Sequence, residues 1–417
     1  MKDQPSKLNR LIFYAYENVP YFNNVVNERD ANIEKVESAN DLNLLPVFTK
    51  ETIKQYGWKN FVSQEYFDSV NDRFIRKDIR IERTSGTTSE PMDIPWLNPD
   101  YYTSMFSHWR FRQKEFGIST LSKKCSNIGY HKSDKPFAPS NNDSIITINN
   151  AALSYNNILL ILDGVLQFRP EWLYIQPSVL FVILRIAAEN GISLPSSIKY
   201  VEYVGEPLLP YYKEFIEKYL NCRTVNMYGC AETNGIAYEC SNGNLHVIED
   251  NAVVEIVDDK RSLGYDQIGN VCVTGLHNRL MPMIRYRLDD EAIMRKGSMC
   301  MCGNNSPILE LLYTRLPAML LFDDVNLCKE GKIFYPLNSL NFIHIQDTDV
   351  VFKIDVLNLK NYQVTFYFSH NNNFEKKMLN NIFIKIMHKF GLSNIQFTFI
   401  YSYENYSTKI IGILRLA

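Results

Sequence analysis

The segment RTSGTTSEP, residues 83–91, decides how the rest of the chain is interpreted. It has no apolar face to bury, which favours a tight loop over a helix or a strand. Glycine lets a backbone approach a ligand closely, and hydroxyl and backbone N–H groups donate hydrogen bonds to anions. Four hydroxyl side chains surround Gly86: Thr84, Ser85, Thr87 and Thr88. We predict a phosphate-binding loop, with an ordinary surface loop as the alternative.

The flanking residues favour strands on both sides of this loop. KDIRIE (77–82) alternates between polar and apolar residues, and MDIPW (92–96) can form a second strand. The loop is not a P-loop of the GxxxxGK[ST] type, because no lysine follows a second glycine and no helix signal follows the turn. The choice between the two interpretations of the loop therefore depends on motifs further along the chain.

Length and composition set the broad class. A chain of 417 residues is expected to form two or three domains or subdomains. An apolar fraction of 46% and a charged fraction of 22% are typical of a soluble globular protein. The net charge of −2 gives no electrostatic reason to expect nucleic acid or an anionic membrane as a partner.

The longest apolar run, residues 179–188, is interrupted by Arg185 and is too short to span a bilayer. The N-terminal apolar run is too short for a secretory signal and lacks a small-residue cleavage site. We therefore expect a cytoplasmic protein, whose eight cysteines are free thiols or, where they cluster, metal ligands.

The order of elements predicts an α/β fold. Strand, loop and helix signals alternate from about residue 121 to 233, which is typical of a wound sheet with ligand loops after its strands. Short β segments from about residue 246 indicate a β subdomain. From about residue 316, strands and an amphipathic helix (373–391) indicate a small α+β domain. Helices are also expected at 5–28 with a break at Pro20, and at 100–117, 178–191 and 209–220, and residues 42–57 are expected to form a loop that leads into a helix.

Three further motifs follow the hydroxyl-rich loop in order: VGEPL (204–208), YGCAE (228–232) and MIRYRLDD (283–290). Together the four motifs resemble those of adenylate-forming acyl ligases. The likeness is greatest to the branch with phenylacetate–CoA ligase and the CapK-like proteins of capsular polysaccharide biosynthesis. It extends over roughly residues 10–315 and is weak beyond them. Any one motif is unspecific, whereas four in order are specific.

The resemblance implies an N-terminal body (1–314) and a C-terminal lid domain (315–417). It implies an ATP- and Mg²⁺-dependent enzyme that activates a small carboxylic acid as the acyl-adenylate, releases pyrophosphate and passes the acyl group to CoA. Such catalysis consists mainly of positioning and of neutralising charge. Two alternatives stay open: an amine or hydroxyl acceptor, and a degenerate member that binds nucleotide without catalysis. A homodimer is compatible with the resemblance.

The resemblance also assigns roles to residues. The loop residues Ser85, Gly86, Thr87 and Thr88 are expected to hold the β- and γ-phosphates, with Thr87 also counted as catalytic. Glu232 is expected to hold Mg²⁺, which prefers oxygen ligands. Asp290 is expected to accept hydrogen bonds from the ribose hydroxyls. The residues expected to flank the adenine are Gly205, Glu206, Pro207, Tyr228 and Gly229. Arg315 is expected at the hinge, and Lys409 as the catalytic lysine of the lid.

The chain departs from the family pattern at the loop and at the hinge. Ser89 and Glu90 stand where glycine and a basic or small residue are usual, and a carboxylate there repels a triphosphate at close range. Ala318 replaces the usual acidic hinge residue, and Pro317 stiffens the pivot. These departures keep the non-catalytic alternative open.

Two cysteine-containing segments predict a second metal site. Cys240 precedes His246 by six residues, and Cys300 and Cys302 share the tight turn CMCG. Three sulfurs and an imidazole are the ligands of a closed tetrahedral zinc site. The alternative is a set of buried thiols and a core histidine. His108, Trp109 and Tyr130 are candidates for the acyl pocket, with ordinary core packing as the alternative.

Overall fold

The computed structural model divides the chain into two compact units, each described by itself below. The first unit is Met1–Gly117 with Val225–Arg315, and the second is Ile118–Thr224 with Leu316–Ala417. The structure describes residues 6–36, 38–69, 78–84, 92–128, 135–139, 144–149, 155–205, 208, 210–258, 261–312, 348–358, 361–367, 377, 380–381, 384, 396–402 and 412–416.

The first unit begins with helices whose ends follow from local sequence. The hydroxyl of Ser6 accepts a hydrogen bond from the backbone N–H of Asn9 and caps the first helix. Pro20 starts the second helix, because proline fits the first helical position but not a helix interior. The predicted break at this proline is confirmed. The helices of this unit are α1 (Lys7–Asn18), α2 (Pro20–Glu28), α3 (Lys50–Tyr56), α4 (Gln64–Phe67), α6 (Asn98–Ser104) and α7 (Phe106–Phe116), with the 3₁₀ turns η1 (Ile33–Lys35), η2 (Ala39–Leu44) and η3 (Trp58–Phe61).

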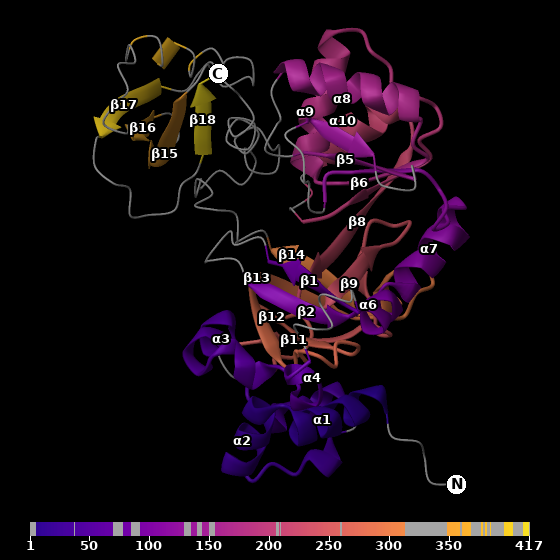
Figure 1. Cartoon of the computed structure of the whole chain (residues 1–417), viewed down its shortest axis with the longest axis vertical. Helices are drawn as coiled ribbons and strands as arrows, with labels where there is room; N and C mark the ends of the chain where they lie inside the picture. The colour runs from indigo at the N-terminus through magenta and orange to yellow at the C-terminus, as the bar shows by residue number, and fades with distance from the viewer. Residues whose placement is uncertain are drawn as a thin grey trace. The chain divides into compact units, whose positions relative to one another are not determined.

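An antiparallel sheet forms the centre of the first unit (Figure 1). Its strands lie in the order β11-β12-β13-β14-β10-β9-β8. Apolar side chains of α1 and α2 join those of the strands in one core, which includes Leu11, Phe22 and Val271. The strands are β8 (Arg223–Cys230), β9 (Asn234–Glu239), β10 (Leu245–Val247), β11 (Ala252–Val257), β12 (Ile268–Gly275), β13 (Tyr286–Arg295) and β14 (Ile308–Leu312), and the turn η5 (Gly297–Met299) precedes β14.

The two strands predicted around the hydroxyl-rich loop are present as β1 (Ile79–Arg83) and β2 (Asp93–Leu97), which pair antiparallel. The single helix predicted for 100–117 is wrong in one respect, because it is interrupted at Met105 and forms α6 and α7. The side chain of Asn234, which comes from β9, donates to the hydroxyl of Ser104 at 2.6 Å beside this break. Gly117 ends α7 with a left-handed φ of 66°.

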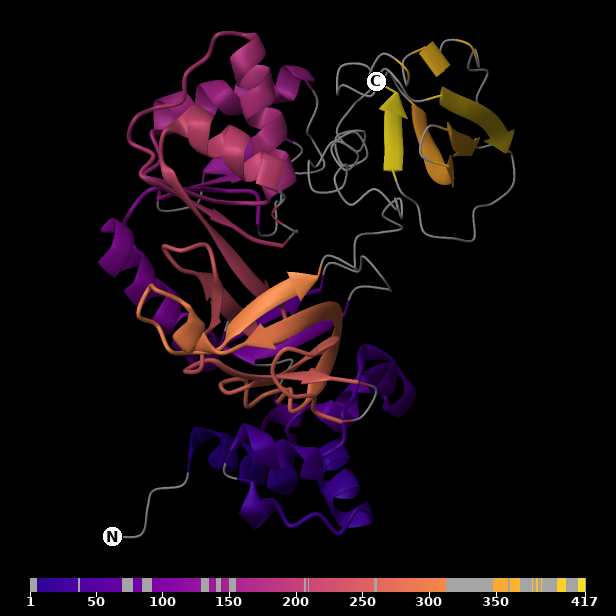
Figure 2. The same ribbon diagram turned by 180° about the vertical axis from the view of Figure 1, so that it is seen from behind.

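The second unit contains the predicted wound sheet, with strand order β7-β6-β3-β5-β4. All pairs are parallel except β4 with β5. Figure 2 shows the three helices of this unit gathered beside the strands, and their apolar side chains share one core with them. The elements are β3 (Lys124–Ser126), β4 (Phe137–Pro139), β5 (Ile145–Ile148), α8 (Tyr155–Phe168), β6 (Trp172–Ile175), α9 (Pro177–Glu189), β7 (Tyr200–Tyr203) and α10 (Pro210–Leu220).

The C-terminal residues form a four-stranded sheet of order β17-β16-β15-β18, in which only β16 and β17 are parallel. Three strands lie where the sequence predicts them, whereas β18 was not predicted. Most of the predicted helix 373–391 lies outside the described residues. The strands are β15 (Thr348–Asn358), β16 (Asn361–Tyr367), β17 (Gln396–Ser402) and β18 (Gly412–Leu416).

These elements confirm an α/β fold. The division into a body (1–314) and a lid domain (315–417) stays a prediction. Within the part of the chain that is described, every helix is too short or too polar to cross a membrane.

Candidate active site

The YGCAE motif lies at the closed end of the hairpin formed by β8 and β9. Gly229 faces Gly235 across this hairpin, next to a register shift between Tyr228 and Gly229. A Cβ atom on Gly229 would lie 2.5 Å from the carbonyl oxygen of Asn234. That distance is shorter than any ordinary contact, so the tight turn requires glycine here.

Tyr228 and Asp290 come together although they are 62 positions apart in the sequence. The Tyr228 hydroxyl donates to Oδ2 of Asp290 at 2.8 Å, between β8 and β13. Both side chains are half-buried. The structure thus places the residue predicted to flank adenine beside the residue predicted to bind ribose.

Glu232 is buried, with 5% of its surface exposed. The hydroxyl of Tyr286 donates to its Oε1 at 3.0 Å, and this tyrosine precedes Asp290 on the same strand. The indole N–H of Trp96 fixes the adjacent backbone by donating to the Ala231 carbonyl at 3.1 Å. Burial, with a further contribution from the Glu232 carboxylate, raises the pKa of the Cys230 thiol well above its usual value. This thiol therefore stays protonated and is not a nucleophile.

The strands β1 and β2 close the base of the hydroxyl-rich loop. The backbone N–H of Thr84 donates to the Met92 carbonyl at 2.9 Å, and the N–H of Met92 donates to the Thr84 hydroxyl at 2.8 Å. Arg83 binds both carboxylate oxygens of Asp93, at 2.6 and 2.9 Å, and this pairing lowers the pKa of Asp93.

Sequence reasoning gave no role to Lys50 or to Tyr286. The ammonium group of Lys50 donates to the Thr84 hydroxyl at 3.4 Å, so a basic group lies at the base of the predicted phosphate loop. Both residues lie in segments that carry the resemblance, LPVFTK (45–50) and MIRYRLDD, and that placement was the available signal. Their partners become visible only in the folded chain.

Gly205 belongs to the second unit and follows β7 with a φ of 78°. A side chain there would be strained, and a Cβ atom would lie 3.8 Å from Cγ of Gln176. Gln176 is held by two hydrogen bonds with the side chain of Asn127, at 2.7 and 2.9 Å. The glycine of VGEPL thus follows a strand end in a backbone conformation that favours glycine, and its predicted place beside adenine stays a prediction.

His108 is fully buried against β9. Its ring centroid lies 5.6 Å from that of Tyr238, and a Cβ atom on Gly235 would lie 1.8 Å from its Nε2. The guanidinium of Arg112 lies 4.7 Å from the ring centre of Trp109. His108 thus makes the contacts expected of ordinary core packing, and a role of His108 and Trp109 in the acyl pocket stays a prediction.

Several predicted site residues lie outside the described part of the chain: Ser85, Gly86, Thr87, Thr88, Ser89, Glu90, Tyr130, Glu206, Pro207, Arg315, Pro317, Ala318 and Lys409. Their predicted roles stay predictions. The four candidate zinc ligands are described, and they lie together in the first unit.

Known proteins resemble this chain at low sequence identity. The model of the AMP-binding enzyme family matches residues 147–282. Phenylacetate–coenzyme A ligase of Thermus thermophilus is 22% identical over 341 residues, covering 78% of this chain and 72% of that protein. Protein CapK of Staphylococcus aureus is 23% identical over 292 residues, covering 67% of this chain and 60% of that protein.

A solved structure of 2-hydroxyisobutyryl-CoA ligase, in the postadenylation state with 2-HIB-AMP, shares the fold. Its TM-score is 0.64 at 16% identity, covering 97% of this chain and 86% of that chain. The resemblance inferred from the four motifs is therefore confirmed: this chain is an enzyme similar to the adenylate-forming acyl ligases, and its curated relatives include phenylacetate–coenzyme A ligase and CapK.

Proposed function

We propose that this protein activates a carboxylic acid with ATP, forming an acyl-adenylate and pyrophosphate, and then transfers the acyl group to coenzyme A. The observation that carries the proposal is the hydrogen bond between Tyr228 and Asp290. It joins the YGCAE and RYRLDD motifs, which the resemblance assigns to adenine and ribose. An aromatic ring beside a carboxylate is a suitable pair for a nucleoside, because the ring can stack on a base and the carboxylate can accept from hydroxyl groups.

Glu232 supports the proposal through its charge. Within the described residues, its side chain accepts from the neutral Tyr286 hydroxyl and also contacts the neutral Cys230 thiol, and none of the ion pairs found there includes Glu232. A buried carboxylate that lacks a basic partner is costly unless a cation accompanies it. Oxygen donors suit Mg²⁺, so the residue fits the predicted metal role. When bound, Mg²⁺ would neutralise negative charge on the phosphates of ATP.

Coenzyme A is the proposed acceptor because of the relatives. Two of them carry the name phenylacetate–coenzyme A ligase. A structure of 2-hydroxyisobutyryl-CoA ligase with 2-HIB-AMP and CoA, in the thioesterification state, has a TM-score of 0.61 to this chain. The test of the proposal includes several classes of carboxylic acid.

Pyrophosphate exchange tests the first half-reaction. Purified protein is incubated with ATP, Mg²⁺ and labelled pyrophosphate in the presence of aryl, amino or fatty acids. We expect ATP to become labelled with at least one class of acid and only when Mg²⁺ is present. Exchange that is absent with every acid, in protein that still binds ATP by calorimetry, would instead favour a non-catalytic nucleotide-binding protein.

Product analysis tests the second half-reaction. With the active acid, addition of coenzyme A should yield the acyl thioester, detected by mass. Amines and hydroxyl compounds serve as competing acceptors in parallel reactions. Formation of an amide or ester in place of the thioester would be consistent with the adenylation step but would show that coenzyme A is not the acceptor.

A further inference from the structure

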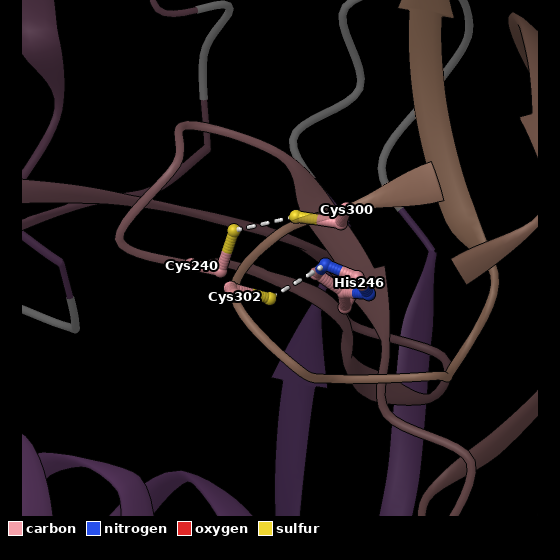
Figure 3. Close-up of side chains that lie close together, drawn as sticks. All are labelled: Cys240, His246, Cys300 and Cys302. Carbon is pink, nitrogen blue, oxygen red and sulfur yellow. Dashed lines mark hydrogen bonds between the residues drawn. The ribbon is translucent and has the colours of Figure 1, made fainter. Parts of the chain in front are cut away.

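Four soft ligand side chains converge in the first unit at one end of β9, where the strand leaves the YGCAE hairpin. Figure 3 shows Cys240, His246, Cys300 and Cys302 pointing toward one another. Cys240 directly follows β9 and His246 lies in β10, whereas Cys300 and Cys302 lie between η5 and β14. Their ligand atoms all lie within 4.8 Å of one another. We infer that these residues bind one structural Zn²⁺ ion.

The distances match a tetrahedral site. Zinc–sulfur bonds of ~2.3 Å in a tetrahedron place two sulfurs about 3.8 Å apart. The Sγ atoms of Cys240 and Cys300 are 3.7 Å apart, too far for a disulfide and suited to two thiolates on one metal. Cys302 Sγ lies 3.3 Å from Nε2 of His246, which is close to the sulfur–nitrogen spacing of the same tetrahedron.

The histidine is oriented for metal binding. Its Nδ1 lies 2.8 Å from the backbone carbonyl oxygen of Ser306, and a carbonyl can only accept a hydrogen bond. The proton therefore sits on Nδ1, and Nε2 faces the sulfurs with its lone pair. A backbone carbonyl that fixes the second ring nitrogen is a common feature of zinc-bound histidines.

Each sulfur also receives a hydrogen bond that suits a thiolate. The backbone N–H groups of Asn242 and Asn304 donate to Cys240 and Cys302, each at 3.4 Å. The side-chain amide of Asn244 donates to Cys300 at 3.2 Å. The two backbone donors each lie two residues after their cysteine, and a glycine with positive φ follows in each turn, at Gly243 and Gly303. A backbone N–H two residues after the cysteine thus donates to sulfur on both sides of the cluster.

The chemical types of the four ligands indicate which metal ion binds and that its role is structural. Three thiolates and an imidazole suit Zn²⁺, whereas Mg²⁺ and Ca²⁺ prefer oxygen ligands. His246 is 2% exposed and Cys300 is 8% exposed, while the other two sulfurs are half-buried. Four protein ligands complete the tetrahedron and leave no position for a substrate, so the metal is structural. It would cross-link the β9–β10 turn to the loop before β14, across 60 positions of sequence.

Metal analysis of the full-length chain, purified under reducing conditions without added zinc, tests the site. We expect about one zinc per chain in the wild type. Cys300→Ser/Cys302→Ser should reduce this to near zero and lower the Tm. Cys222→Ser is the matched control, because Cys222 is a half-buried thiol outside the cluster, and it should retain zinc. Wild-type protein that contains no zinc and takes up none when Zn²⁺ is added would overturn the proposal, as would a double variant that retains full zinc.

A second measurement uses the wild-type fold in case the double variant fails to fold. Protein produced with Co²⁺ in place of Zn²⁺ should show the strong visible bands of tetrahedral cobalt together with thiolate-to-cobalt charge transfer. His246→Asn should shift these bands, because one nitrogen ligand changes. Weak octahedral bands would exclude the site. Intact-mass measurement provides the final check, since a Cys240–Cys300 disulfide in freshly isolated protein would show that the pair is redox-active and does not bind metal.

Discussion

Two buried glutamates of the first unit differ in what neutralises them. Glu255 and Glu232 are 6% and 5% exposed, so their burial is nearly equal. Glu255 accepts two hydrogen bonds from the guanidinium of Arg285, at 3.0 and 3.1 Å, and a third from Ser262. Glu232 accepts from the neutral Tyr286 hydroxyl. Among the residues that the structure describes, Glu255 is neutralised by a guanidinium, whereas Glu232 has a neutral donor and no basic partner.

The difference separates a structural role from a functional one. Arg285 also donates to the backbone carbonyl of Leu45 at 2.6 Å and to the side chain of Asn43, so it connects the residue directly before β13 to the N-terminal segment. A pair compensated in this way holds the fold together and offers nothing to a ligand. A buried carboxylate beside the proposed nucleotide residues, with a neutral donor, is instead prepared to receive a cation.

Arg285→Ala tests the structural side of the comparison and should have the largest effect. Removing one partner leaves Glu255 as an uncompensated buried charge, which costs about 3–5 kcal/mol of unfolding free energy. Urea denaturation measures the loss. Arg295→Ala is the control, because Arg295 ends β13, the strand that directly follows Arg285, but pairs at the surface with Asp266 and Glu310. It should cost far less, because ion pairs between exposed side chains contribute little to stability. Equal losses in the two variants would refute the structural assignment of Arg285.

Glu232→Gln tests the functional side. The amide has nearly the same shape and removes a buried charge, so the unfolding free energy should change little. Pyrophosphate exchange should fall by about 100-fold or more, equivalent to about 2.7 kcal/mol in the activation barrier. Glu239→Gln is the control, since Glu239 is equally buried and accepts from the backbone of Asn226 at the other end of the hairpin. Undiminished exchange in Glu232→Gln would make this carboxylate an ordinary buried group.

Asp290→Ala should weaken ATP binding while leaving the fold intact. The half-buried carboxylate is proposed to accept a charge-assisted hydrogen bond from ribose, worth about 1.5–3 kcal/mol. The expected loss is therefore about 10- to 100-fold in Kd, measured by calorimetric titration. Asp266→Asn, an exposed carboxylate on the same unit, should bind ATP as the wild type does. Unchanged affinity in Asp290→Ala would remove this residue from the site.

Tyr286→Phe sharpens the comparison and should have the smallest effect. Without its phenol donor, Glu232 loses a buried hydrogen bond, so the unfolding free energy should fall by about 1–2 kcal/mol. Mg²⁺ and ATP bind only the folded state and should restore part of this loss. The measurement is the Tm with and without Mg²⁺–ATP, beside Tyr228→Phe, which leaves Glu232 unchanged. A loss that is insensitive to Mg²⁺–ATP would argue against a metal at Glu232.

The fold could be predicted from sequence where local signals were strong. Pro20 and Gly117 mark helix ends because their φ preferences act within one or two residues. Alternation of polar and apolar residues located β1, and β2 lies where a second strand was expected after the loop. The interruption at Met105 could not be predicted in this way, because residues 100–117 contain no internal proline or glycine and the contact beside the break comes from Asn234 in β9.

The candidate site shows the same division. Its motifs could be recognised because each is a short run with a specific residue pattern, and Asp290 and Glu232 were named on that basis. The partners Tyr286 and Lys50 were missed, because a motif specifies residue types and does not specify which side chain will face which.

By itself, the sequence determined the fold class, the family resemblance, the principal helix ends and the set of candidate ligands. Only the tertiary structure decided that Tyr228 donates a hydrogen bond to Asp290 and that Arg285 forms an ion pair with Glu255. It also decided that the four candidate zinc ligands lie together. The physical reason is sequence separation. Caps, turns and strand alternation depend on neighbouring residues, whereas these contacts join residues 30 to 62 positions apart, and Arg285 reaches Leu45 across 240 positions. Contacts of that kind exist only after the strands have paired and the core has packed around them.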